Sequence, residues 1–282
     1  MPDQSQRFEL HCMDIWSGYQ SVENEVSTPG MDMFVYSEPH LGARRGGDVY
    51  YVSLCAGGVI TRIILADVSG HGEGISETSG LLRGLMRRYM NSKSQDQLVA
   101  NLNREFTKLA QAGRFATAIV ATYLSHRNRF TICNAGHPLP LKYQAASEKW
   151  SWVSASNDKQ NPRVANLPLG VDDATDYVQF EVDVADGDLL VLYTDAMTEA
   201  RGDEDQMLDS AGLLRMASRL KTDRVREFGS ELLSSVREFR GNRPAEDDVS
   251  LLVLRFVTGR RRTPGVSEKL NAYAKMLGFK PV

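Results

Sequence analysis

The stretch that decides the fold is ITRIILADVSGHG, residues 60–72. Its first part is almost wholly apolar except for Arg62, which predicts a strand buried on both faces. Asp67 ends this strand, and glycines at positions 70 and 72 would let the backbone approach a ligand closely before a helical pattern begins. An aspartate in this place either binds a metal ion or caps the turn into the helix. The stretch alone leaves both interpretations open.

The residues before this strand indicate its first partner. Val49–Cys55 is also rich in β-branched and apolar residues, and Gly57-Gly58 separates the two runs, so we predict a hairpin. A second hairpin is predicted where the turn sequence ADGD joins 179–184 to 189–194. Further strands are predicted at 33–37, 115–124, 130–134, 139–143 and 249–256.

Helical periodicity occurs in two separate regions. Leu81, Leu85 and Tyr89 form an i, i+4 row within 73–91, and apolar residues recur with the same period in 95–111, 208–220 and 224–239. Strands and helices do not alternate as they do in a parallel nucleotide-binding sheet. We therefore expect an α+β fold in which pairs of helices cover antiparallel sheets.

Composition narrows the class of protein. The 282 residues are 42% apolar and 24% charged with a net charge of −3, which is typical of a globular protein and indicates no partnership with nucleic acid or membranes. Three cysteines stand far apart without a CxxC pair, which argues against disulfides and zinc. We see no signal peptide, and the longest apolar passage is too short and interrupted to span a bilayer. A cytoplasmic location is expected.

Four aspartates end or precede apolar strands at distant places in the chain: Asp48 in GGD, Asp67 in DVSGHG, Asp195 in TDA and Asp247 in EDDVS. Each one alone could cap a helix or sit in a turn. Nearly two hundred residues separate the first from the last, yet each could project a carboxylate into a common cleft. Hard divalent cations prefer oxygen ligands, and no short segment could supply enough of them. The joint pattern predicts a metal-dependent enzyme.

Seven segments carry a family resemblance. GGDVYY, DVSGHG, GRFATA, NAGHP, LPLGV, LYTDAMTEA and DDVSLLV follow one another in this order. Together they resemble the SpoIIE-type branch of the PPM family of metal-dependent serine/threonine phosphatases, the protein phosphatase 2C superfamily. The resemblance covers residues 28–256, which we take as the phosphatase domain. Residues 1–27 would be an N-terminal extension, and 257–282 a basic tail with a short helix at 267–277.

This resemblance implies a four-layer α-β-β-α sandwich of two antiparallel sheets with a pair of Mn²⁺ or Mg²⁺ ions between them. Asp67 would bridge the ions, the Val68 carbonyl would complete one of them, and Asp195 and Asp247 would hold the other. Asp48 would bind metal directly or orient its waters. The cations would lower the pKa of a bridging water and position a phosphoryl group for in-line attack, so no covalent intermediate is expected.

Other residues are weaker candidates. Arg44 and Arg45 precede GGD and could bind substrate phosphate through bidentate contacts, or they could simply be exposed. His71 could be a general acid for the leaving serine oxygen or could fix its own loop, and His137 is interpreted as a residue that shapes its loop. We leave both out of the catalytic set. Ala196 stands where the family usually has glycine, which removes no ligand.

The resemblance also suggests a substrate. Members of this branch dephosphorylate phosphoserine or phosphothreonine on STAS-domain anti-anti-sigma proteins, so we expect a phosphoprotein of this kind. Two alternatives stay open: a non-catalytic adaptor with the same fold, and a metal hydrolase of small phosphoesters. All four carboxylates are present, which favours activity, and no GxxxxGK[ST] motif occurs. The apolar stripe of 73–91 could form a homodimer contact, although a place in the core is favoured.

Overall fold

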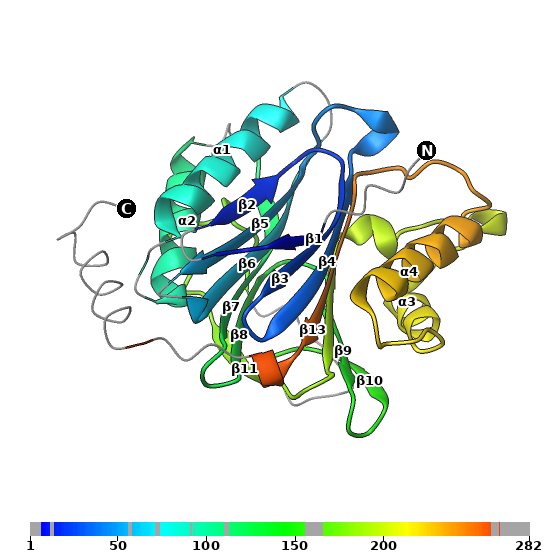
Figure 1. Ribbon diagram of the computed structural model, residues 1–282. Coiled ribbons are helices and arrows are strands. Elements are labelled where there is room, and N and C mark those ends of the chain that lie inside the picture. Colours follow the sequence, from blue (N-terminus) through cyan, green and yellow to red (C-terminus); the bar gives the residue numbers. More distant parts are fainter. Residues whose placement is uncertain are drawn as a thin grey trace.

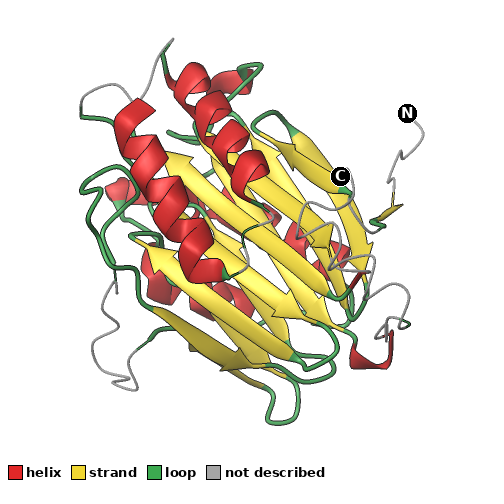
Figure 2. Cartoon of the chain, turned by 90° about the vertical axis from the view of Figure 1, so that its left-hand side faces the viewer, coloured by secondary structure: helices red, strands yellow, loops and turns green. Residues whose placement is uncertain are grey.

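Two β-sheets lie face to face in the computed structural model, and a pair of α-helices covers the outer face of each (Figures 1 and 2). The structure describes residues 7–260 and residue 265, apart from 12–13, 56–57, 71–73, 91, 93, 110–112 and 156–165. The predicted α+β, four-layer sandwich is confirmed. The helix predicted at 267–277 lies outside the described residues.

The first sheet has seven strands, and its neighbouring strands come from both ends of the chain. Their order across the sheet is β1 (Arg7–Glu9), β3 (Val22–Thr28), β4 (Met31–Glu38), β13 (Val249–Phe256), β12 (Leu189–Tyr193), β9 (Leu141–Gln144) and β10 (Lys149–Trp152). All pairs are antiparallel except β1 with β3 at the sheet edge. Pairing of β13 with β4 and β12 brings the start of β13 beside the end of β12.

The second sheet has six strands, and all its pairs are antiparallel. Their order is β11 (Gln179–Asp183), β8 (Arg129–Ala135), β7 (Ala116–Leu124), β6 (Ile60–Val68), β5 (Asp48–Cys55) and β2 (Ile15–Gly18). The predicted pairing of β5 with β6 is confirmed, although part of its turn lies outside the described residues. Strands β2 and β3 begin before residue 28 and are hydrogen-bonded into the two sheets, so these sheets include residues N-terminal to the predicted domain start.

The predicted hairpin between 179–184 and 189–194 is wrong. Strand β11 pairs with β8 in the six-stranded sheet, whereas β12 pairs with β13 and β9 in the seven-stranded sheet. Val182 and Leu190 are both buried in the core between the sheets, which they enter from opposite sides. The predicted turn is present, since the Asp188 N–H donates to the Ala185 carbonyl at 3.2 Å, but it leads the chain from one sheet to the other.

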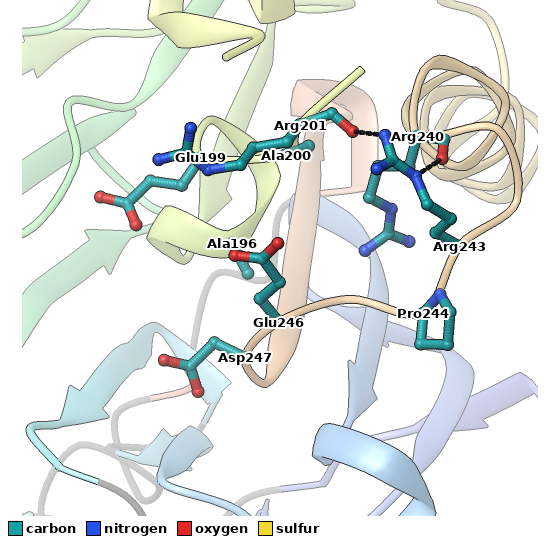
Figure 3. A pocket seen from close by; sticks show the side chains of 9 residues that line it. All are labelled: Ala196, Glu199, Ala200, Arg201, Arg240, Arg243, Pro244, Glu246 and Asp247. Carbon is teal, nitrogen blue, oxygen red and sulfur yellow. Dashed lines mark hydrogen bonds between the residues drawn. The ribbon is translucent and has the colours of Figure 1, made fainter. Parts of the chain in front are cut away.

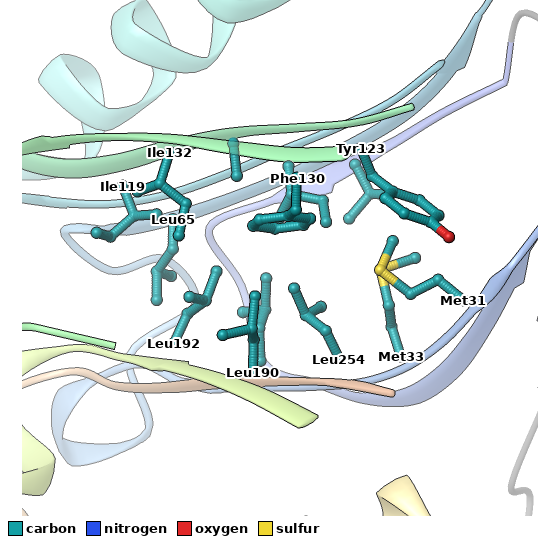
Figure 4. Close-up of a cluster of buried hydrophobic side chains, with 14 of the residues drawn as sticks. Met31, Met33, Leu65, Ile119, Tyr123, Phe130, Ile132, Leu190, Leu192 and Leu254 are labelled. Carbon is teal, nitrogen blue, oxygen red and sulfur yellow. The ribbon is translucent and has the colours of Figure 1, made fainter. Parts of the chain in front are cut away.

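Successive side chains of a strand point to opposite faces of its sheet, and the inner faces of the two sheets meet in one core. Phe130, Ile132 and Ile119 project from one sheet towards Leu190 and Leu254 of the other (Figure 4). All five side chains are fully buried, and burial of one such side chain contributes about 1.5–3 kcal/mol to stability. This core fixes the distance between the two sheets, and with it the spacing of the groups at their ends.

Helices α1 (Ile75–Tyr89) and α2 (Gln95–Leu109) cover the six-stranded sheet, while α3 (Asp209–Ala217) and α4 (Val225–Phe239) cover the other. Leu82, Leu85 and Met86 of α1 are buried against the sheet. The apolar stripe of 73–91 thus packs within the chain. No described helix is long and apolar enough to cross a membrane.

Short 3-10 turns join the larger elements. They comprise η1 (His40–Gly42), η3 (Asp195–Met197), η4 (Asp203–Asp205) and η5 (Thr258–Arg260). The first two lie directly after β4 and β12 respectively, which places them at strand ends where the predicted site residues also occur.

Candidate active site

The four predicted aspartates occupy strand ends of both sheets. Asp48 begins β5 and stands opposite Asp67, near the end of β6. Asp195 follows β12, and Asp247 precedes β13 by two residues, so this pair comes from the other sheet. The charges of Asp195 and Asp247 act on Asp67. The structure therefore brings the four positions together at one end of the sandwich.

Burial and like charge raise the pKa values of the carboxyl groups of Asp48, Asp67 and Asp195. The pKa of Asp67 rises to about 7, first through burial and then through Asp195, Asp247 and Asp248. Burial, Glu199 and Asp247 raise that of Asp195. Among the described residues, none of the four predicted aspartates forms an ion pair with Lys, Arg or His. Such a concentration of negative charge is typical of a functional site.

Asp48 is the most deeply buried of the four, with only 2% of its surface exposed. Burial, Asp67 and Asp248 raise its pKa well above the ordinary range. Its Oδ2 accepts a hydrogen bond of 2.9 Å from the Thr194 hydroxyl, but its Oδ1 has no hydrogen-bond partner. A buried oxygen without a partner is costly, so this atom fits contact with a cation or with its bound water.

The described part of the chain contains no group of three or more His, Cys, Asp or Glu side chains already placed to hold a metal ion. The donor set nevertheless fits a hard cation, because carboxylate oxygens predominate and one of them is buried without a partner. We therefore expect the carboxylates to move together when a cation neutralises their repulsion.

The two adjacent acids Asp247 and Asp248 differ sharply in environment. Asp248 is buried and accepts backbone hydrogen bonds from His40 (2.6 Å), Gly47 and Asp48 (3.2 Å). Asp247 is exposed, and one of its oxygens accepts the backbone N–H of Asp248 at 2.8 Å. The Asp248 carboxylate is therefore committed to backbone groups, whereas the Asp247 side chain stays exposed.

Close approach of Asp248 explains the two glycines of the GGD motif. A Cβ atom at Gly46 would lie 2.8 Å from Oδ1 of Asp248 and closer still to Oδ2. At Gly47 a Cβ would lie 3.1 Å from the Val68 carbonyl oxygen and 3.3 Å from Oδ2 of Asp248. These contacts place Val68 beside the loop that carries Asp48.

An open cleft of ≈ 940 Å³ adjoins these carboxylates. Its lining includes His40, the run 43–47, Gly70, Ile75, Ser76, Glu246, Asp247 and Asp248. Arg44 and Arg45 are exposed on its rim, and the Arg45 guanidinium lies 5.4 Å from the centre of the Tyr19 ring. Neither arginine is among the charges that act on Asp48, Asp67 or Asp195. The two arginines thus lie at the cleft without being among the charges that shift these carboxyl groups.

A smaller pocket of ≈ 70 Å³ shares Glu246 and Asp247 with the cleft (Figure 3). Glu199, Arg240 and Arg243 also line it. The Arg243 side chain donates hydrogen bonds to the carbonyls of Arg201, Gly202 and Arg240, so its guanidinium is committed to the pocket wall.

His137 is buried beneath this end of the sandwich. Its Nδ1 lies 2.8 Å from the hydroxyl of Thr117, the residue opposite Asp67 in the β6–β7 pair. Its backbone N–H and C=O both bond to the Asn134 side chain. Burial lowers its pKa to about 3, so the ring is neutral near pH 7. These contacts agree with the predicted role of His137 in shaping its loop. His71 lies outside the described residues.

Sequence reasoning missed Thr194 and the anchoring contacts of Asp248. Thr194 lies in the motif LYTDA, where a hydroxyl residue directly before an aspartate was the available signal. In the structure Thr194 is buried. Its hydroxyl donates to Asp48 and accepts the Ser250 N–H at 2.9 Å, which ties β12 and β13 to β5. No pattern in the sequence relates Asp248 to backbone groups about two hundred residues away.

Comparison with known proteins relates this chain to a protein family. Residues 59–257 match the family described as Stage II sporulation protein E (SpoIIE). Phosphoserine phosphatase RsbU of Bacillus subtilis (strain 168) is 27% identical over 198 residues, which covers 68% of this chain and 55% of RsbU. The chain thus spans little more than half the length of this relative.

Solved structures share the fold. The SiaA-PP2C domain of Pseudomonas aeruginosa gives a TM-score of 0.66 at 18% identity, over 79% of this chain and 84% of that domain. The catalytic domain of the serine/threonine phosphatase PstP, solved with 2 manganese ions, gives 0.55 at 15% identity, over 81% and 99%. These similarities establish a PP2C-type fold. Because the SpoIIE match covers most of this chain, the chain belongs to the SpoIIE family.

Proposed function

We propose that this protein is a metal-dependent serine/threonine phosphatase that removes phosphate from a phosphoprotein. The observation that carries the proposal is the meeting of four aspartates from both sheets, with Asp67 at a pKa of about 7 and Asp48 holding a buried, unpartnered oxygen. The SpoIIE family match and the activity named for the relative RsbU support it.

The groups that would hold the metal are the carboxylates of Asp48, Asp67, Asp195 and Asp247 and the backbone carbonyl of Val68. The expected occupant is a pair of Mn²⁺ or Mg²⁺ ions, supported by the two manganese ions in the PstP structure. When bound, these ions supply an activated water and neutralise the charge of the phosphoryl group.

The remaining residues of the site position these ligands. Thr194 orients Asp48 through its hydroxyl, and Asp248 fixes the backbone of Gly47 next to it. Arg44 and Arg45 stand on the rim, where their guanidinium groups can meet the phosphate or the acidic residues of a substrate. Such preorganised groups raise the rate because they need no reorientation during the reaction.

For the substrate we propose a regulatory phosphoprotein of the STAS-domain type in the cytoplasm. The resemblance to the RsbU-like branch and the family match support this choice. The alternatives are an adaptor that binds phosphoproteins without hydrolysis and a hydrolase of small phosphoesters. The ligand-type carboxylates are all present, which favours catalysis over the adaptor.

A direct test compares phosphate release from a phosphoserine peptide and from p-nitrophenyl phosphate in the presence of Mn²⁺. A protein phosphatase should release phosphate from the peptide, and Asp195→Asn should reduce this rate by two or more orders of magnitude. Activity on p-nitrophenyl phosphate alone would favour the small-phosphoester hydrolase. Binding of the peptide without any phosphate release would favour the adaptor.

A further inference from the structure

The connection between β4 and β5 forms a short lip, residues 40–45, at the mouth of the cleft. Residues 41–45 are all exposed, and His40, Ala43, Arg44 and Arg45 line the cleft. In Figure 1 this connection, in blue, projects beyond the ends of the strands. A ligand whose phosphate reached Asp67 would therefore have the lip beside it.

Although exposed, the lip is firmly attached at both ends. The Asp248 carboxylate accepts the N–H of His40 at its beginning and that of Gly47 just beyond its end. The Gly46 N–H also donates to the Tyr19 carbonyl at 2.8 Å, and Arg45 lies over the ring of the same tyrosine. A surface held in one conformation before binding loses less entropy when a partner docks.

Leu41 is the unusual residue of this lip. It is 77% exposed, more than any other large apolar side chain in the described ranges. Its φ of +50° lies in the left-handed region, where glycine and asparagine are accommodated at lower cost than leucine. Its side chain is mostly exposed, so it is available for contact with another molecule.

The charges beside Leu41 define what that molecule carries. Arg44 and Arg45 form no ion pair with any acid in the described part of the chain. The lip thus offers one apolar and two cationic groups, whereas the cleft beyond it is lined by Glu246, Asp247 and Asp248. A long polyanion such as nucleic acid would be repelled by these acids far more strongly than a protein segment that carries only a few acidic residues near the lip.

Resting on the proposed function, we propose that the lip selects the phosphorylated segment of a substrate protein. Leu41 would contact an apolar residue near the phosphoserine, and Arg44 and Arg45 would pair with acidic residues beside it. The lip is thus a specificity-determining element, distinct from the carboxylates that hold the metal.

The test uses two short phosphoserine peptides, one with leucine and glutamate around the phosphoserine and one with serine and lysine. With Mn²⁺, we expect wild-type kcat/KM to favour the first peptide by about tenfold, as one apolar contact and two rim charge pairs would give. Leu41→Asn keeps a residue suited to the left-handed backbone, and the preference should fall to about threefold, whereas Leu41→Met should restore it. Arg44→Glu should bring the two peptides close to parity.

Matched controls separate this effect from general surface changes. Val178→Ser alters an apolar side chain that is 54% exposed and does not line the cleft, and Arg219→Ala removes an exposed arginine after α3. Both should leave the peptide preference unchanged. Equal turnover of the two peptides by the wild type, or an unchanged preference in Leu41→Asn, would overturn the lip proposal alone. Failure to release phosphate from any phosphoester would overturn the proposed function instead.

Discussion

Asp48 and Asp67 stand directly opposite each other across strands β5 and β6. Asp67 raises the pKa of Asp48, which burial has already raised. A buried and a half-buried carboxyl group on adjacent strands destabilise the folded chain when both are ionised, unless a cation lies near them. The register of β5 and β6 therefore holds two carboxylates that repel each other, and a bound metal ion would relieve this repulsion.

The first prediction concerns pH and the Asp67 carboxyl group. Its pKa is about 7 in the folded protein against an ordinary value of 3.8. Between these values the folded protein holds a proton that the unfolded chain releases, so the stability of metal-free protein should fall as pH rises from about 4 to about 7. Asp67→Asn should therefore stabilise metal-free protein at pH 8 by roughly 2–4 kcal/mol, because one pKa unit corresponds to about 1.4 kcal/mol.

Urea unfolding in EDTA at pH 5 and pH 8 measures this effect. The gain from Asp67→Asn should be smaller at pH 5 than at pH 8. Asp183→Asn, which changes an exposed aspartate at the end of β11, should alter stability little at either pH. An Asp67→Asn protein that is less stable than the wild type at pH 8 would show that this carboxylate is already compensated without metal.

The second prediction concerns Asp248, whose carboxylate accepts three backbone N–H groups. Its charge also raises the pKa values of Asp48 and Asp67, so its removal has two opposing effects. We expect loss of the hydrogen bonds to dominate, because each buried N–H left without a partner costs about 1–3 kcal/mol. Asp248→Ala should destabilise the protein by roughly 2–4 kcal/mol in urea unfolding, and Asp248→Asn by less. A more stable Asp248→Ala protein would mean that repulsion outweighs the hydrogen bonds.

The third prediction contrasts two glycines. A methyl group at Gly46 would collide with the Asp248 carboxylate, whereas Gly84, exposed within α1, has no atoms within 4 Å of the corresponding position. Gly46→Ala should cost about 1–3 kcal/mol of stability and reduce phosphate release. Gly84→Ala should add about 0.5–1 kcal/mol through its higher helix propensity. Differential scanning calorimetry should show melting temperatures that shift in opposite directions, and equal shifts would contradict the packing described here.

Much of the fold could be predicted because each element carries its own local signal. The continuous apolar runs and the glycine turn between them indicated the hairpin of β5 and β6, and the i, i+4 row of Leu81 and Leu85 indicated a helix that lies on a sheet. The assignment of β11 and β12 to one hairpin failed for a physical reason. Val182 and Leu190 enter one core from opposite sheets, and a turn sequence does not distinguish a connection between two sheets from a hairpin within one.

The candidate site could be predicted as a set of motifs but not as a set of contacts. Asp48, Asp67, Asp195 and Asp247 stand out because each adjoins an apolar strand. The environment of Asp248 depends on backbone groups that only the folded chain brings near it. Likewise, the left-handed backbone at Leu41 has no signature in its residue type, since leucine rarely adopts it.

The most direct test of the central claim is phosphate release from a phosphoserine peptide after metal removal and replacement. The account predicts no turnover in EDTA, recovery on addition of Mn²⁺ or Mg²⁺, and a loss of at least two orders of magnitude in Asp67→Asn at saturating metal. Full turnover in EDTA, or an Asp67→Asn protein as active as the wild type, would contradict it.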